Sequence, residues 1–126
     1  MTHIITYKSD TSTIEIKYQG DVSMNEVRKI YTNAAQMVKE HNCHLVFSDY
    51  REATIKLSTL EIYDLPKVLS GILSQFEISV YKLKRAFVVA KDLQDYNFYE
   101  TVTLNQGQNA RIFQDMVEAK EWLSKK

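Results

Sequence analysis

The chain has 126 residues, of which 44% are hydrophobic and 25% charged, and its 16 basic and 16 acidic side chains give a formal net charge of zero. This length and composition are typical of one globular domain with an ordinary hydrophobic core, so we expect residues 1–126 to form a single domain. A neutral chain without a long run of like charge has no field that would attract nucleic acid or an anionic membrane.

The lone cysteine and the N-terminal residues bear on the cellular compartment. Cys43 has no partner for an intramolecular disulfide, and within its apolar run it is expected to be a small buried hydrophobe. Residues 1–10 lack the pattern of a signal peptide, and no apolar run reaches the roughly 18 residues of a membrane helix. We therefore expect a cytoplasmic protein, in a reducing compartment, without integral membrane association.

The first two apolar runs predict a β-hairpin. Residues 3–8 are rich in β-forming side chains. Residues 12–18 alternate, so that their isoleucines and Tyr18 share one face of a half-buried strand. Residues 9–11, Ser-Asp-Thr, are typical of a turn, and Gly20 is expected to end the second strand.

A capping box at Ser23 and Glu26 opens the first predicted helix. Apolar residues recur behind it at helical spacing, which predicts a helix over residues 24–40. Residues 43–48, CHLVFS, form a continuous apolar run, which is typical of a strand covered on both faces.

A second capping box, at Ser58 and Glu61, opens the next helix. This helix meets Pro66, which removes a backbone donor, so we expect a kink or a restart near Asp64. An apolar stripe continues beyond the proline. Residues 77–83 alternate weakly, and an extra strand is one alternative for them.

The C-terminal part continues with a second buried strand over residues 85–90, RAFVVA. Asp92 or Asp95 is expected to open a third helix, which Asn105 and Gly107 stop in a C-cap pattern.

A short strand, ARIF, and a final helix opened by a third capping pattern at Asp115 and Glu118 complete the chain. Strands separated by helices imply right-handed crossovers and a mainly parallel sheet. The predicted fold class is therefore α/β, in the order β-β-α-β-α-β-α-β-α, with an antiparallel N-terminal hairpin strand and four helices.

Three stretches together resemble the SpoIIAA-like, or STAS-like, domains. They are LVFSDYREATIKLSTLEIYDLP, RAFVVA and YNFYETVTLNQGQNARIFQDMVEAKEWL, and the likeness extends over roughly residues 4–123. The resemblance implies a mixed β-α sheet and kinship in shape with the CRAL/TRIO lipid-carrier domains. It also implies a regulator that binds a partner kinase or anti-sigma factor and is phosphorylated on a serine at the start of the helix after the middle strand.

Ser58 and Thr59 are the only residues that match this phosphorylated position, so the resemblance makes them the regulatory candidates. The acid-serine-serine-glycine turn of those regulators is absent, and a nine-residue polar loop over residues 49–57 is expected in its place. Gln106 stands where close relatives are expected to carry a basic residue. The alternative for Ser58 is a plain N-cap, whose neighbouring glutamate would repel an added phosphate.

Asp49, Tyr50 and Arg51 are the candidate ligand-binding residues. Asp49 is expected just past the C-terminal end of a buried strand, at the rim where open α/β sheets bind ligands. Arg51 is suited to hold a carboxylate or phosphate, and Tyr50 combines an apolar body with a polar tip. The alternative is that Asp49 and Arg51 pair with each other and hold the loop.

The sequence has no catalytic, cofactor or metal signature. His41 and His44 flank Cys43, but a second ligand pair is missing, and a helix end that runs into a strand does not bring these side chains to one point. The motifs of serine hydrolases and nucleotide-binding loops are also absent.

The predicted function is therefore that of a non-enzymatic regulatory or binding module without a cofactor. It is expected to bind a protein partner, or a small apolar or anionic ligand, at the strand-end rim, as a monomer or homodimer. One alternative is a lipid-carrier-like module with a cavity between the kinked helix and the sheet, lined by Leu65, Leu69, Ile72 and Leu73. Another alternative is a small enzyme that uses Asp49 and a histidine.

Overall fold

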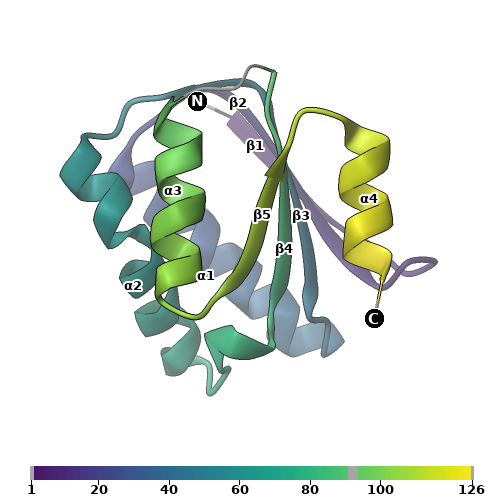
Figure 1. Ribbon diagram of the computed structural model, residues 1–126. Coiled ribbons are helices and arrows are strands. Elements are labelled where there is room, and N and C mark those ends of the chain that lie inside the picture. Colours follow the sequence, from purple (N-terminus) through teal and green to yellow (C-terminus); the bar gives the residue numbers. More distant parts are fainter. Residues whose placement is uncertain (1, 91–93, 126) are drawn as a thin grey trace.

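The computed structural model describes residues 2–90 and 94–125, and within them one sheet is flanked by helices on both faces (Figure 1). In chain order the elements are β1 (Thr2–Lys8), β2 (Thr13–Val22), α1 (Met24–His41), β3 (Leu45–Ile55), α2 (Thr59–Gln75), the 3-10 turn η1 (Val80–Lys82), β4 (Lys84–Val88), α3 (Gln94–Asn105), β5 (Asn109–Phe113) and α4 (Met116–Ser124).

The sheet follows the order of the chain, β1-β2-β3-β4-β5. β1 is antiparallel to β2, and the three remaining pairs are parallel. Each crossover between parallel strands leads to the next strand in the same direction across the sheet, from β2 to β5. Right-handed crossovers in one direction place their helices α1, α2 and α3 on one face, while α4 covers part of the other (Figure 1). The α/β class and the antiparallel N-terminal strand are thereby confirmed.

Helix ends follow the predicted capping chemistry. The hydroxyl of Ser23 accepts a hydrogen bond from the backbone N–H of Glu26, and Asp115 accepts from two amides in the first turn of α4. The N–H of Gly107 donates to the carbonyl of Leu104 at the end of α3. Gly107 has a φ of 78°, a conformation that glycine adopts without strain, which confirms this C-cap.

The hydrophobic core has two layers. The larger one lies between the sheet and α1–α3, and Ile14, Ile16 and Tyr18 are buried there together as their alternation predicted. The smaller layer lies beneath α4, where Ala119 and Leu123 pack against apolar side chains of β3 and β4.

Two strands are longer than expected. β2 continues through Gly20, which has a φ of 74°, as far as Val22. β3 begins at Leu45 and extends to Ile55, so the polar loop predicted over residues 49–57 was wrong. Residues 49–55 remain in the strand because they pair in parallel with β2, which leaves polar side chains at the solvent-facing positions.

The other differences lie in the helical connections. α2 runs without a restart through Pro66, and residues 77–83 contain a 3-10 turn instead of an extra strand. Asp92 lies outside the described residues, and Asp95 lies inside α3, so Asp95 is not its cap.

Candidate functional site

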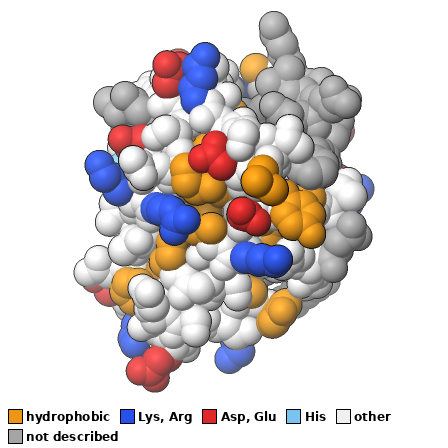
Figure 2. Space-filling model, turned by 90° about the vertical axis from the view of Figure 1, so that its left-hand side faces the viewer, with side chains coloured by type: hydrophobic (Ala, Val, Ile, Leu, Met, Phe, Trp, Pro, Cys, Tyr) orange, Lys and Arg blue, Asp and Glu red, His pale blue; other side chains and the backbone are white. Residues whose placement is uncertain are grey.

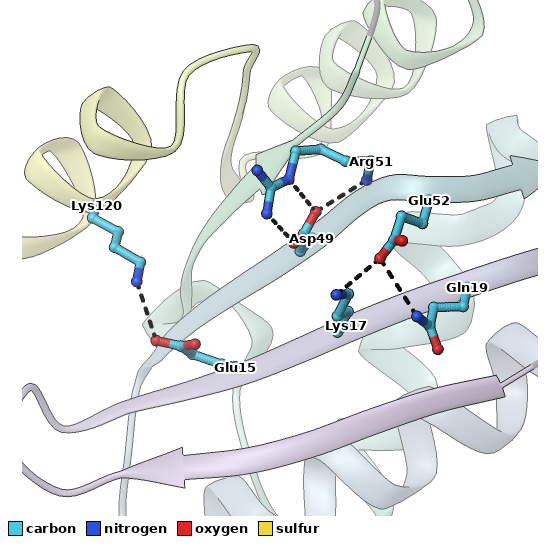
Figure 3. Close-up of polar contacts among 7 residues, drawn as sticks. All are labelled: Glu15, Lys17, Gln19, Asp49, Arg51, Glu52 and Lys120. Atoms are coloured by element: carbon cyan, nitrogen blue, oxygen red, sulfur yellow. Dashed lines mark hydrogen bonds and ion pairs between the residues drawn. The ribbon is translucent and has the colours of Figure 1, made fainter.

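A β-bulge in β3 decides where the predicted ligand residues lie. Lys17 pairs with Asp49, and the next pair joins Gln19 to Glu52, so β3 has one residue more than β2 over this step. Asp49, Arg51 and Glu52 consequently share the sheet face that carries α4 (Figure 3). Tyr50 packs into the core on the opposite face. The structure does not bring the three predicted residues into one site.

Asp49 and Arg51 form a closed pair. Arg51 donates from Nη2 to Oδ2 of Asp49 at 2.8 Å and from Nε to Oδ1 at 3.0 Å, and its backbone N–H also donates to Oδ1. Burial alone raises the pKa of Asp49, but the hydrogen bonds and positive charge of Arg51 outweigh it and hold that pKa below its ordinary value. The predicted alternative of mutual pairing is therefore the arrangement that the structure has.

The neighbouring charges on this face are also paired (Figure 3). Lys17 Nζ lies 2.8 Å from Oε2 of Glu52, and Gln19 donates to the same oxygen. The hydrogen bond from Lys17 lowers the pKa of Glu52, and the same bond raises the pKa of Lys17. Two of the five N–H donors of the Arg51 guanidinium bind Asp49, so an anion that approached Arg51 would share it with that carboxylate.

Tyr50 lies on the other side of the sheet and stacks on Tyr18, with ring centroids 4.1 Å apart. It lines an apolar pocket of about 40 Å³ at the C-terminal end of β3. An apolar cavity of about 150 Å³ holds a molecule as small as benzene, so a pocket of about 40 Å³ has no room for an acyl chain. Of the four residues predicted to line a lipid cavity, Leu65 alone lines this pocket.

A buried arginine, which sequence reasoning missed, joins the sheet to two helices. Arg85 is 4% exposed and donates to the hydroxyl of Tyr99 at 2.9 Å and to Oε1 of Gln108 at 2.7 Å. Gln108 in turn donates to the carbonyl of Pro66 at 2.9 Å. In the described part of the chain, no carboxylate forms an ion pair with Arg85.

Buried tyrosines surround this arginine. Burial raises the pKa of Tyr18 to about 12, and burial also raises the pKa values of Tyr31 and Tyr50 well above the ordinary value. These hydroxyls therefore stay neutral at physiological pH, and none of the three is a general base near neutrality. The arrangement cross-links the core and offers no activated nucleophile.

Ser58 and Thr59 lie at the exposed start of α2. Ser58 accepts from the N–H of Glu61 at 3.1 Å and its own N–H donates to Oε1 of Glu61 at 2.9 Å, which is a complete capping box. The predicted N-cap is thus confirmed, and no observation tests the regulatory role of Ser58 or Thr59.

Two large apolar side chains lie next to them, and neither was among the predicted ligand-binding residues. Leu60 is 70% exposed and Tyr63 46% exposed, and Nζ of Lys67 lies 5.7 Å from the Tyr63 ring centroid. Figure 2 shows hydrophobic side chains gathered in the middle of the face that carries α2, with charged groups among them. We call the side chains of Ser58, Thr59, Leu60, Tyr63 and Lys67 the α2 surface. The sequence pattern that indicates their exposure is that Leu60 and Tyr63 lie outside the stripe of buried residues on their helix.

Within residues 2–90 and 94–125, no group of three or more His, Cys, Asp or Glu side chains is arranged to hold a metal ion. His41 stacks on Tyr7, with ring centroids 3.9 Å apart. No described helix has the length and apolar character needed to span a bilayer.

No protein-family model matches the chain, and no curated protein matches it. Solved structures do match. An anti-sigma factor antagonist from Mycobacterium paratuberculosis is 11% identical with a TM-score of 0.61, over 98% of this chain and 94% of that one. The anti-sigma factor antagonist SpoIIAA in its unphosphorylated form is 6% identical with a TM-score of 0.59, over 95% and 94%.

A third match is an uncharacterized protein of the DUF3478 family, with a SpoIIAA-like fold, from Shewanella loihica PV-4. It is 17% identical with a TM-score of 0.58, over 97% of this chain and 92% of that chain. This chain therefore has the SpoIIAA-like fold, as its resemblance in sequence implied.

Proposed function

We propose that this chain is a non-enzymatic regulatory module that binds a protein partner through the α2 surface. The observation that carries the proposal is the exposure of Leu60 and Tyr63, one helical turn apart and beside Ser58 and Thr59. Large exposed apolar side chains that cluster, with polar groups around them, are typical of protein interaction sites.

The surface continues as a hollow toward α3. Tyr63 and Lys67 of α2, Val102 of α3 and Gln106, which directly follows α3, line a depression of about 410 Å³. A protein side chain that lies in this depression would contact both helices. The α2 surface thus combines protruding apolar groups with a recess next to them.

The fold supports a protein-binding role. Two of the matched structures are described as anti-sigma factor antagonists, a name that refers to action on another protein. The mutual pairing of Asp49 with Arg51 argues against a role for these two residues in binding a ligand, and Tyr50 faces the opposite side of the sheet. We therefore place recognition at α2 and not at those three residues.

Ser58 and Thr59 are the proposed regulatory residues within this surface. Both are exposed, at the positive end of a helix that has free N–H groups in its first turn. A phosphate here would place negative charge directly beside Leu60 and would change what the α2 surface can bind.

The test is affinity capture from cells that express the protein natively. Wild type is immobilised in parallel with Leu60→Ala/Tyr63→Ala and with Val117→Ala, a matched control that alters a side chain on α4 that is 64% exposed. We expect a protein that wild type and Val117→Ala retain equally and that the double variant loses. The partner is then confirmed by binding of the two purified proteins.

Equal retention of every captured protein by the double variant would contradict the proposed surface. Circular dichroism melts of all three proteins exclude unfolding as the cause of a loss, because truncation of exposed side chains changes stability by only about 0.5 kcal/mol.

A further inference from the structure

The two edges of the sheet differ in how their backbone is protected. At the β5 edge, the N–H of Ile112 donates to Oε2 of Glu100 at 2.6 Å, so a side chain of α3 blocks a five-residue strand. The β1 edge has seven residues, and within the described part of the chain β1 pairs with β2 alone. β1 therefore presents a longer row of backbone donors and acceptors.

The sequence of β1 also lacks the usual devices that prevent edge pairing. It contains no proline, and its one charged residue, Lys8, is at its end. Ile4, near its middle, is 58% exposed on the same face as Lys17. A strand of this kind is suited to accept another strand.

We propose that a second copy of this chain pairs with β1 in the antiparallel direction, so that the two sheets become continuous. A pairing centred on Ile5 places Ile4 opposite Thr6 of the second copy and His3 opposite its Tyr7. The two Lys8 side chains then lie at opposite ends of the pair, whereas parallel pairing would put them side by side. The formal net charge of zero adds no repulsion between copies.

The space beside β1 suits this arrangement. A hollow of about 290 Å³ lies between β1 and α1, lined by His3, Ile5, Asn33, Gln36, Met37 and Glu40. Directly opposite residues of an antiparallel pair share a face, so the second copy would bring its own Ile5 to this hollow. The pairing thus fills this hollow and also provides hydrogen-bond partners for the backbone groups at the β1 edge.

The test is sedimentation analysis over a wide range of protein concentration. Wild type is expected to approach twice the mass of the chain as concentration rises. Ile4→Lys/Thr6→Lys puts lysine opposite lysine in the proposed register, so this variant is expected to remain at the mass of one chain. Val117→Lys adds an exposed charge on α4 and is expected to associate like wild type.

Charge complementation tests the register itself. Ile4→Glu/Thr6→Glu alone is expected to stay monomeric for the same reason, and its mixture with the lysine variant is expected to restore a dimer that salt weakens. Circular dichroism establishes that each variant is folded.

Three outcomes would overturn the proposal. They are a wild type that stays monomeric at every concentration, a lysine variant that dimerises as well as wild type, and a mixture of the two folded variants that remains monomeric. Hydrogen exchange of wild type gives an independent readout, since the β1 amides are expected to exchange more slowly as concentration increases, and unchanged exchange would count against the pairing.

Discussion

Gln108 joins Arg85 of β4 to the carbonyl of Pro66 in α2, because its side-chain oxygen accepts from the guanidinium at 2.7 Å and its nitrogen donates to the carbonyl at 2.9 Å. Among the residues that the structure describes, Arg85 has no carboxylate partner, so its buried charge depends on neutral groups of this kind. The bridge therefore holds α2, which carries the proposed binding surface, against the sheet.

The first prediction concerns this bridge. Gln108→Leu leaves an N–H group of the buried Arg85 guanidinium without its acceptor, so we expect a loss of about 2–4 kcal/mol in the free energy of unfolding. Urea denaturation measures it. Gln106→Leu, which changes a partly exposed neighbour, is expected to stay within about 0.5 kcal/mol of wild type. Equal stability of the two variants would show that the bridge contributes nothing.

The second prediction concerns Thr103, which is fully buried and whose Oγ1 has no hydrogen-bond partner among the described residues. Thr103→Val replaces this hydroxyl by a methyl group of similar shape. Removal of an unpaired buried polar atom is expected to raise the free energy of unfolding by about 1 kcal/mol. Thr103→Ala is the comparison, because it removes the same hydroxyl but leaves a cavity and is expected to destabilise. A destabilised Thr103→Val protein would indicate a partner for the hydroxyl.

The features of the fold that could be predicted from the sequence are those that a local sequence pattern determines. The helix starts at Ser23, Ser58 and Asp115 follow from their own turn of sequence, and the mainly parallel sheet follows from the alternation of strands with helices. The extension of β3 depends on pairing with a distant strand. Its polar residues read as a loop until β2 is placed beside them.

The candidate site was harder to predict for the same reason. The bulge in β3 separates Tyr50 from Asp49 and Arg51, and nothing in the residues around it marks an inserted residue. Arg85 was visible as a charge that opens an apolar run, yet its partners are 14 and 23 residues away in the chain. Only the fold brings those three side chains together.

The third prediction concerns acid sensitivity. The folded pKa of Asp49 lies below its ordinary value of 3.8, so the stabilisation from its pairing with Arg51 is present above that value. It is lost as the pH falls below 3.8 and through the lower folded pKa. We expect Asp49→Asn to be less stable than wild type at neutral pH and to lose stability less steeply in this acid range. Parallel curves of unfolding free energy against pH for wild type and Asp49→Asn would contradict a stabilising pair between Asp49 and Arg51.

The fourth prediction separates the two roles of Ser58. Ser58→Ala removes the N-cap and is expected to cost about 1 kcal/mol of stability, whereas Ser58→Asp keeps a side-chain acceptor and is expected to stay close to wild type. If Ser58 also regulates binding, Ser58→Asp will alter capture of the partner without a change in melting temperature. Unaltered capture by Ser58→Asp would leave the serine with its capping role alone.

The central claim, that α2 is the partner-binding surface, is tested most directly by hydrogen exchange of the protein with and without its captured partner. The account predicts slower exchange across the first turns of α2, from Ser58 to Lys67, when the partner is bound. Protection confined to α4 or to the sheet face around Asp49, with unchanged exchange in α2, would contradict it.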